Sequence, residues 1–236
     1  MSISKYLRDY NGNRVFPYTL AENVIGLSDG TSLNGATNRL LGKKIGVIGD
    51  SYVYGHTLGT DKVWCKLIAD RNSMTLYNYG VNGCKLSGTD ATSVLTRYSS
   101  MEANLDYIIV FAGHNDSGLS VTIGEESSTD KTTFYGSLNL LCNGLQTKYP
   151  SARILFMTPS KRTGKELPYA DAIIKACRNY SIPVFDTYGE LGILIGSSPT
   201  GNTNQKTVFE LGASIHLNEL GNEYLSYKVE ARLLGL

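Results

Sequence analysis

A serine and a histidine far apart in the sequence are the residues best suited to chemistry. Ser51 follows an apolar run and the pair Gly49-Asp50, so it falls in a strand-to-helix turn that can expose its Oγ beside backbone N–H donors. His216 lies on a loop just before the last helical segment, and the chain has only 3 histidines. A serine nucleophile with a histidine base performs acyl transfer. The alternative for Ser51 is an ordinary helix cap.

Two further turns could stabilise the negative oxygen that such an attack creates. Gly83, in the sequence Val-Asn-Gly, offers a backbone N–H that a ligand can approach closely because glycine has no side chain. Asn115, followed by Asp116 in the sequence Gly-His-Asn-Asp, offers a side-chain amide as a second donor. Glycine and asparagine are also common in ordinary turns, so each signal alone is weak.

Several neighbours of these turns are candidate substrate contacts. Tyr52 and His56 follow the serine, and His114 precedes Asn115. Packing at a helix start or in a loop is the alternative interpretation for all three. Cys84 stands beside Gly83, but no histidine or carboxylate adjoins it in the sequence, which disfavours a thiolate nucleophile.

Short apolar runs separate the turns and predict the strands that position them. The runs are rich in β-branched residues and cover 45–48, 76–81, 107–111, 154–157 and 184–185. Runs this continuous suit strands buried on both faces of a parallel sheet. The first three runs end at the turns described above. Because ligands bind at the carboxyl ends of parallel strands, we expect the turns to share one site.

Segments with helical periodicity alternate with these runs. Their apolar residues recur at spacings of three and four, at Phe134, Leu138, Leu141 and Leu145, at Ala170, Ile173, Ile174 and Cys177, and at Leu217, Leu220, Tyr224, Leu225 and Leu233. Alternation of strand and helix predicts a three-layer α/β/α sandwich over residues 43–236.

Taken in order, the four motifs resemble the SGNH/GDSL hydrolase family. The matching residues are Ser51 with Gly49 and Asp50, then Gly83, then Asn115 with Asp116, and finally His216. The resemblance implies a flavodoxin-like parallel sheet and ester hydrolysis through an acyl-enzyme on Ser51, with His216 as base. It also implies an oxyanion hole formed by Ser51 N–H, Gly83 N–H and the Asn115 amide, and no metal or organic cofactor.

One position departs from the family pattern. The family has an aspartate three residues before the catalytic histidine, and this chain has Ala213 there. That carboxylate orients the imidazole and stabilises its charged form. Three explanations remain open: a Ser-His dyad whose histidine is oriented by a backbone carbonyl or another acid such as Glu210, a weakened or binding-only member, or an engineered substitution.

Composition excludes several other functions. Lys+Arg 22 against Asp+Glu 21 leaves a net charge of +1, so neither nucleic acid nor a membrane surface is an expected partner. Hydrophobic residues make up 42%, enough for a buried core. No apolar run approaches the roughly 18 residues of a membrane span, and no export signal begins the sequence. The 4 cysteines are widely spaced, as reduced core residues would be.

Residues 1–42 have too little apolar content for a core of their own. We interpret them as an arm that wraps the following domain, associates copies of the chain, or attaches to a partner. The stretches 15–25 and 28–33 look like attachment segments of bacteriophage tail proteins. The expected location is therefore the cytoplasm or a virion.

The loops between the motifs are polar, at 117–120 and 125–130, and the chain has 16 tyrosines. This pattern favours a carbohydrate ester, with an O-acetyl group as the acyl part, over a lipid. The competing hypothesis is a module that binds acylated glycans without hydrolysing them.

Overall fold

The structure is a computed structural model that describes residues 7–8, 14–15, 39–56, 58–193, 208–210 and 215–236. The chain forms two units, residues 1–39 and 40–236. In the first unit, β1 (Leu7–Arg8) pairs with β2 (Arg14–Val15) in antiparallel register. The remaining residues expected to form the arm lie almost entirely outside the described part of the chain, so its attachment role stays a prediction.

The second unit is built on five parallel strands. In spatial order these are β4 (Thr75–Gly80), β3 (Lys44–Gly49), β5 (Tyr107–Phe111), β6 (Arg153–Met157) and β7 (Val184–Phe185). This is the flavodoxin-like order. Gly49 pairs in register with both Gly80 and Phe111, so the first three strands end level with one another. Their following turns therefore meet at one edge.

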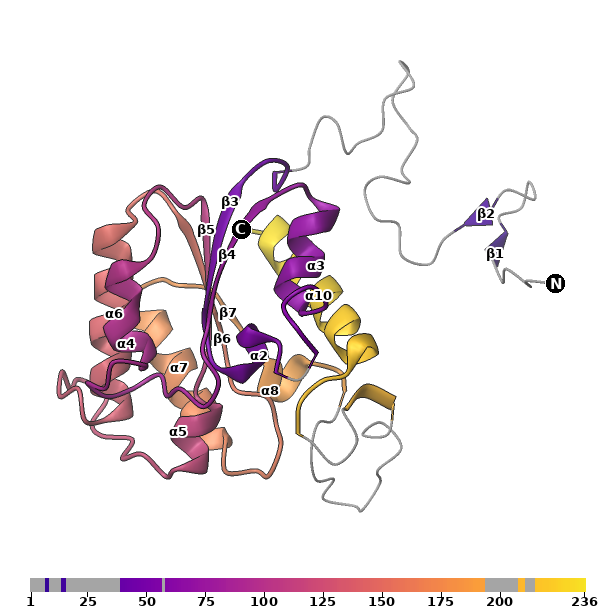
Figure 1. Cartoon of the computed structure of the whole chain (residues 1–236). Coiled ribbons are helices and arrows are strands. Elements are labelled where there is room, and N and C mark those ends of the chain that lie inside the picture. The colour runs from indigo at the N-terminus through magenta and orange to yellow at the C-terminus, as the bar shows by residue number, and fades with distance from the viewer. Residues whose placement is uncertain (1–6, 9–13, 16–38, 57, 194–207, 211–214) are drawn as a thin grey trace. The chain divides into compact units, whose positions relative to one another are not determined.

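Helices cover both faces of this sheet (Figure 1). One face carries α3 (Trp64–Arg71) and α10 (Glu219–Leu234), and the other carries α4 (Val94–Arg97), η2 (Tyr98–Ser100), α6 (Phe134–Lys148) and α7 (Leu167–Asn179). The short helices α2 (Ser51–Tyr54), α5 (His114–Gly118) and α8 (Thr187–Glu190) follow the carboxyl ends of β3, β5 and β7. The predicted three-layer α/β/α sandwich is confirmed.

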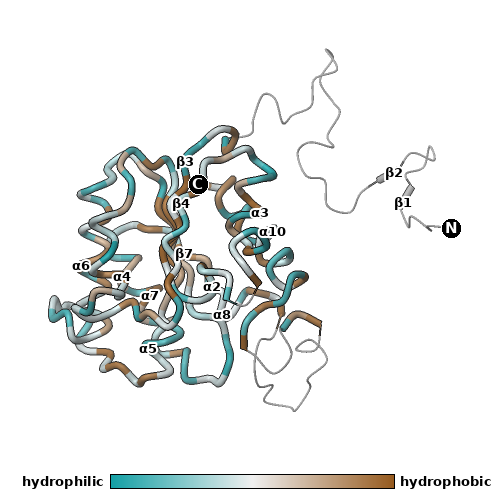
Figure 2. The backbone as a smooth tube through the Cα atoms, viewed as in Figure 1, coloured by the Kyte–Doolittle hydropathy of each residue, from teal (hydrophilic) through white to brown (hydrophobic). Residues whose placement is uncertain are grey.

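Two apolar layers hold the sandwich together because side chains alternate between the faces of each strand. Ile48, Val110 and Phe156 pack toward α6 and α7. Val47, Ile109 and Leu155 pack toward α3 and α10. Figure 2 shows the hydrophobic strands running between the helical layers. All four cysteines are buried as free thiols. Within the described residues, no helix combines the length and the apolar character needed to cross a membrane.

Candidate active site

The turn between β3 and α2 holds Ser51 in a closely packed backbone. A side chain at Gly49 would place its Cβ 2.0 Å from the Phe111 carbonyl oxygen, so only glycine fits there. Asp50 caps α2, because its Oδ1 accepts a hydrogen bond of 3.0 Å from the N–H of Tyr52. Gly55 ends the helix at φ +83°. The serine is therefore the first residue of a single helical turn at the edge of the sheet.

His216 reaches this turn from the segment that precedes α10. Its Nε2 lies 2.8 Å from Ser51 Oγ. Asn222 secures the segment, since its Nδ2 donates to the Leu217 carbonyl at 3.1 Å and its Oδ1 accepts from the N–H of Trp64 at 3.1 Å. The two residues predicted to form a nucleophile and base pair are thus within hydrogen-bond distance, although 165 positions separate them.

The surroundings of His216 keep its imidazole neutral. Burial, followed by the neighbouring His56, lowers the pKa of His216 to about 4, although the Asp50 carboxylate acts in the opposite direction. A histidine with this pKa is unprotonated at neutral pH. It can therefore accept the proton of Ser51 as a general base.

Asp50 and His114 form a buried pair beneath the nucleophile. His114 Nδ1 lies 2.8 Å from Asp50 Oδ2, and the two side chains are 1% and 0% exposed. His114 Nε2 accepts the N–H of Ser160 at 2.9 Å, so the ring proton sits on Nδ1 and is donated to Asp50. Both ring nitrogens are thereby used inside the protein. The imidazole of His114 therefore has no ring nitrogen left for the substrate contact that the sequence allowed.

Tyr52 is also buried, at 4% exposed. Its ring stacks on His114 at 4.3 Å between centroids, and its hydroxyl donates to the carbonyl of Ile215. Of the three residues considered as substrate contacts, only His56 is partly exposed beside the catalytic pair. Its ring centroid lies 4.3 Å from that of His216.

Two of the three expected oxyanion donors, Gly83 and Asn115, stand on turns that are bonded to each other. Gly83 has φ +73° and is exposed, and its N–H meets no acceptor among the described residues. Asn115 Nδ2 donates one hydrogen to the Cys84 carbonyl at 2.8 Å, which leaves the second hydrogen of the amide for a ligand. Asp116, fully buried, accepts from the N–H groups of Leu86 and Ser87 at 2.7 and 3.0 Å. These bonds fix the Gly83 turn against α5.

Burial raises the pKa of Asp116, against the lowering effect of the hydrogen bonds that it accepts. Burial likewise raises the pKa of Cys84 to about 12. The Cys84 thiol donates to the Gly49 carbonyl at 3.1 Å. A thiol held in this way is not a thiolate, which agrees with the preference for Ser51 as nucleophile.

Arg97 supports the site and was not identified from the sequence. Its Nη1 donates to the Tyr79 carbonyl at 2.7 Å, its Nη2 donates to the Gly49 carbonyl at 3.3 Å, and its Nε donates to the Thr92 carbonyl at 2.7 Å. The guanidinium therefore joins the carboxyl ends of β3 and β4. An arginine in a helix of four residues carries no local signal of such a role.

Ala213 lies outside the described residues. Glu210, the alternative acid, is buried at 4% exposed and forms a β-bridge with Leu217, one residue beyond His216.

Among the residues that the structure describes, no three His, Cys, Asp or Glu side chains gather in a way that could hold a metal ion. Ser51, His56 and His216 line a hollow of about 10 Å³, room for about one water molecule. We call this the site hollow.

Comparisons with known proteins agree with this geometry. Residues 47–224 match the model of the GDSL-like lipase/acylhydrolase family. Among curated proteins, none matches the chain. A protein from Lactobacillus plantarum superposes with a TM-score of 0.74 at 23% identity, covering 83% of this chain and 98% of its own. A lipase/acylhydrolase from Enterococcus faecalis superposes with a TM-score of 0.57 at 15% identity, covering 82% and 96%.

A further solved structure, 26% identical, superposes with a TM-score of 0.75 and covers 84% of this chain and 98% of its own. These likenesses support the fold, and the family match spans Ser51, Gly83, Asn115 and His216 together. The chain belongs to the GDSL-like lipase/acylhydrolase family of hydrolases.

Proposed function

We propose that this protein is a carboxylic ester hydrolase that works through an acyl-enzyme on Ser51. The observation that supports this most directly is the distance of 2.8 Å between Ser51 Oγ and His216 Nε2. Hydrogen-bond contact between a nucleophile and a neutral base is what activation of a serine requires. The lowered pKa of His216 supplies the neutral base.

In the proposed reaction, Ser51 Oγ attacks the ester carbonyl carbon while His216 Nε2 takes the serine proton. The N–H groups of Ser51 and Gly83 and the amide of Asn115 stabilise the oxyanion that forms. The bond to the alcohol then breaks, and His216 returns the proton to the leaving oxygen. A water molecule, deprotonated by His216, attacks the acyl-enzyme. The bond from the acyl carbon to Ser51 Oγ then breaks, His216 gives the proton to Oγ, and the carboxylic acid leaves.

For the substrate, we propose an O-acetyl ester of a carbohydrate. The segment 117–120, which covers the end of α5 and the turn after it, is polar except for Leu119, and the loop 125–130 is mostly exposed. Polar surroundings suit the hydroxyl groups of a sugar better than an acyl chain. The attachment role of residues 1–42, with a phage particle as its setting, is a separate proposal supported by the sequence alone.

The test is hydrolysis of p-nitrophenyl acetate by the chain as given, Ser51→Ala and Ala213→Asp. We expect activity in the first and a loss of about 10⁴-fold or more in Ser51→Ala, because removal of the nucleophile disables the whole mechanism. Ser151→Ala, which changes an exposed serine before β6, is the matched control and should keep full activity. Labelling of Ser51 by a fluorophosphonate probe reports the nucleophile independently of substrate choice.

Different outcomes separate the candidate functions. Activity only in Ala213→Asp would mean a competent site weakened by its missing carboxylate. Absence of both hydrolysis and labelling in every variant would favour the module that binds acylated glycans. For the acyl group, acetyl esters should be hydrolysed faster than decanoyl esters, and comparable rates on the two would reject the acetyl assignment.

A further inference from the structure

We propose that the rings of Tyr52 and His56 position His216 for catalysis, a task that the family's aspartate performs in other members. This inference rests on the proposed function, because it assigns a role within the same site. It concerns orientation of the base: an imidazole can rotate about two side-chain bonds, and only one orientation directs Nε2 at Ser51. Residue 213, at the family's acid position, is alanine and provides no carboxylate.

Tyr52 holds both the backbone and the ring of the His216 segment. Its hydroxyl donates to the carbonyl of Ile215, the residue directly before His216. Its ring centroid lies 5.3 Å from the His216 centroid. Tyr52 is itself fixed, since its ring stacks on His114 at 4.3 Å and packs against Phe111 at 5.6 Å. The base therefore lies beside a buried ring that is itself held by a hydrogen bond and by two further ring contacts.

His56 provides the second ring. Its centroid lies 4.3 Å from that of His216, with the ring planes inclined at 38°. Its backbone N–H donates to the Ser51 carbonyl at 3.2 Å, so its position is tied to the nucleophile itself. Both histidines line the site hollow together with Ser51. Any rotation of His216 in this direction would require His56 to move.

His56 also adds an electrostatic effect. The titratable and charged groups with the largest effects on the pKa of His216 are His56, Asp50, His114 and Arg162. His56 lowers the pKa of His216, second only to burial. Replacing His56 by an uncharged ring should therefore raise the pKa of His216. The pH below which the base is lost would then move upward from about 4.

The experiment compares two variants at one position. His56→Phe keeps a ring against His216 but removes the electrostatic effect of the imidazole, and His56→Ala removes both the ring and that effect. We expect His56→Phe to retain kcat within about threefold and to shift the acid limb of kcat/KM to higher pH. We expect His56→Ala to lower kcat by about tenfold, with little change in KM, because ring contacts are worth a modest amount each. Tyr52→Phe, which loses only the bond to the Ile215 carbonyl, should lower kcat by a similar factor.

The pH profile distinguishes this role from simple structural support. Equal thermal midpoints in the three variants, with the acid limb moved only in the His56 variants, would support positioning. Unchanged kcat and an unchanged acid limb in His56→Ala would overturn the inference while leaving the esterase assignment intact. Absence of hydrolysis and of Ser51 labelling in the chain as given would instead overturn the proposed function, and this inference with it.

Discussion

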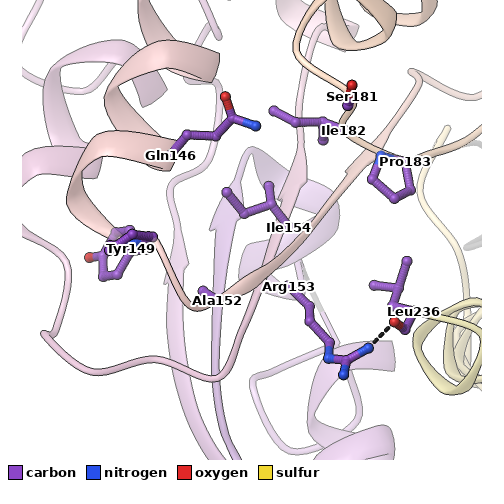
Figure 3. Close-up of a pocket in the computed structure, with 10 residues that line it drawn as sticks. Gln146, Tyr149, Ala152, Arg153, Ile154, Ser181, Ile182, Pro183 and Leu236 are labelled. Atoms are coloured by element: carbon purple, nitrogen blue, oxygen red, sulfur yellow. Dashed lines mark hydrogen bonds between the residues drawn. The ribbon is translucent and has the colours of Figure 1, made fainter.

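The two ends of the central sheet differ in what they offer a ligand. At the amino ends of β6 and β7, a hollow of about 390 Å³ lies among ten residues (Figure 3). They come from the end of α6, the start of β6, the segments that lead into β6 and β7, and Leu236. We call it the amino-end hollow. Arg153 donates to the Leu236 carbonyl across it. At the opposite end, beside α2 where β3 ends, the site hollow measures only about 10 Å³.

The smaller of the two hollows is the one lined by residues that can act in catalysis. The lining of the amino-end hollow includes Gln146, Arg153 and Ser181 but no histidine, cysteine or carboxylate side chain. The lining of the site hollow includes a serine and two histidines, and Ser51 Oγ lies within hydrogen-bond distance of His216 Nε2. Strands that end in Gly-Asp-Ser and Gly-His-Asn-Asp explain the difference, because polar turn residues follow the carboxyl ends. Choosing the candidate site by hollow volume would therefore have led to the amino ends of the strands, away from Ser51 and His216.

Apart from loss of Ser51 itself, loss of the Asn115 amide should lower kcat more than any other change at the carboxyl end of the sheet. Asn115→Ala should lower kcat by about 10²–10³-fold, because the amide is a preorganised donor to the oxyanion. The measurement is kcat and KM on p-nitrophenyl acetate, together with a thermal midpoint. Asn143→Ala, at an exposed position of α6, is the control and should match the unchanged chain. A rise in KM with an unchanged kcat would show that Asn115 binds the ground state instead.

A second, smaller effect concerns the buried pair of Asp50 and His114. His114→Leu leaves the Asp50 carboxylate without one of its donors at a site that is 0% exposed. A lost donor to a buried charged group costs roughly 1–3 kcal/mol or more, so the free energy of unfolding should fall and activity should drop about tenfold. His114→Asn introduces a side chain with the same number and branching of heavy atoms as His114→Leu, and it keeps an N–H near the place of Nδ1–H.

Comparison of these two variants isolates the hydrogen bond from the packing. Urea denaturation curves and kcat should place His114→Asn between the unchanged chain and His114→Leu. Identical losses in both variants would assign the effect to the ring stacked on Tyr52, and the hydrogen bond to Asp50 would then contribute little.

The meeting of the turns at the carboxyl edge could be predicted from the sequence because it depends on topology. Apolar runs that end at Gly49 and before Gly113 predict parallel strands, and parallel strands bring their ends together. The approach of His216 to Ser51 follows in the same way from the return of the last helix to the sheet. None of these predictions requires knowing how a side chain is oriented.

The supporting contacts could not be predicted, because each depends on side-chain geometry between distant segments. Whether His114 faces a substrate or Asp50 is decided by the N–H of Ser160, 46 residues away. Arg97 reaches Tyr79 and Gly49 from a short helix whose own sequence indicates only a turn. Periodicity and turn chemistry report which elements form, and they carry no information on which rotamer a buried side chain adopts.

The smallest expected effect tests the amino-end hollow directly. Gln146 lines it and donates to the Tyr180 carbonyl at 2.7 Å. Gln146→Met keeps the length of the side chain and removes that bond, which should change the free energy of unfolding by at most about 1 kcal/mol. Activity on p-nitrophenyl acetate should stay within about twofold, because the hollow and Ser51 lie at opposite ends of the strands. A tenfold loss of kcat at unchanged stability would mean that the two ends of the sheet are coupled. The amino-end hollow could then no longer be treated as separate from catalysis.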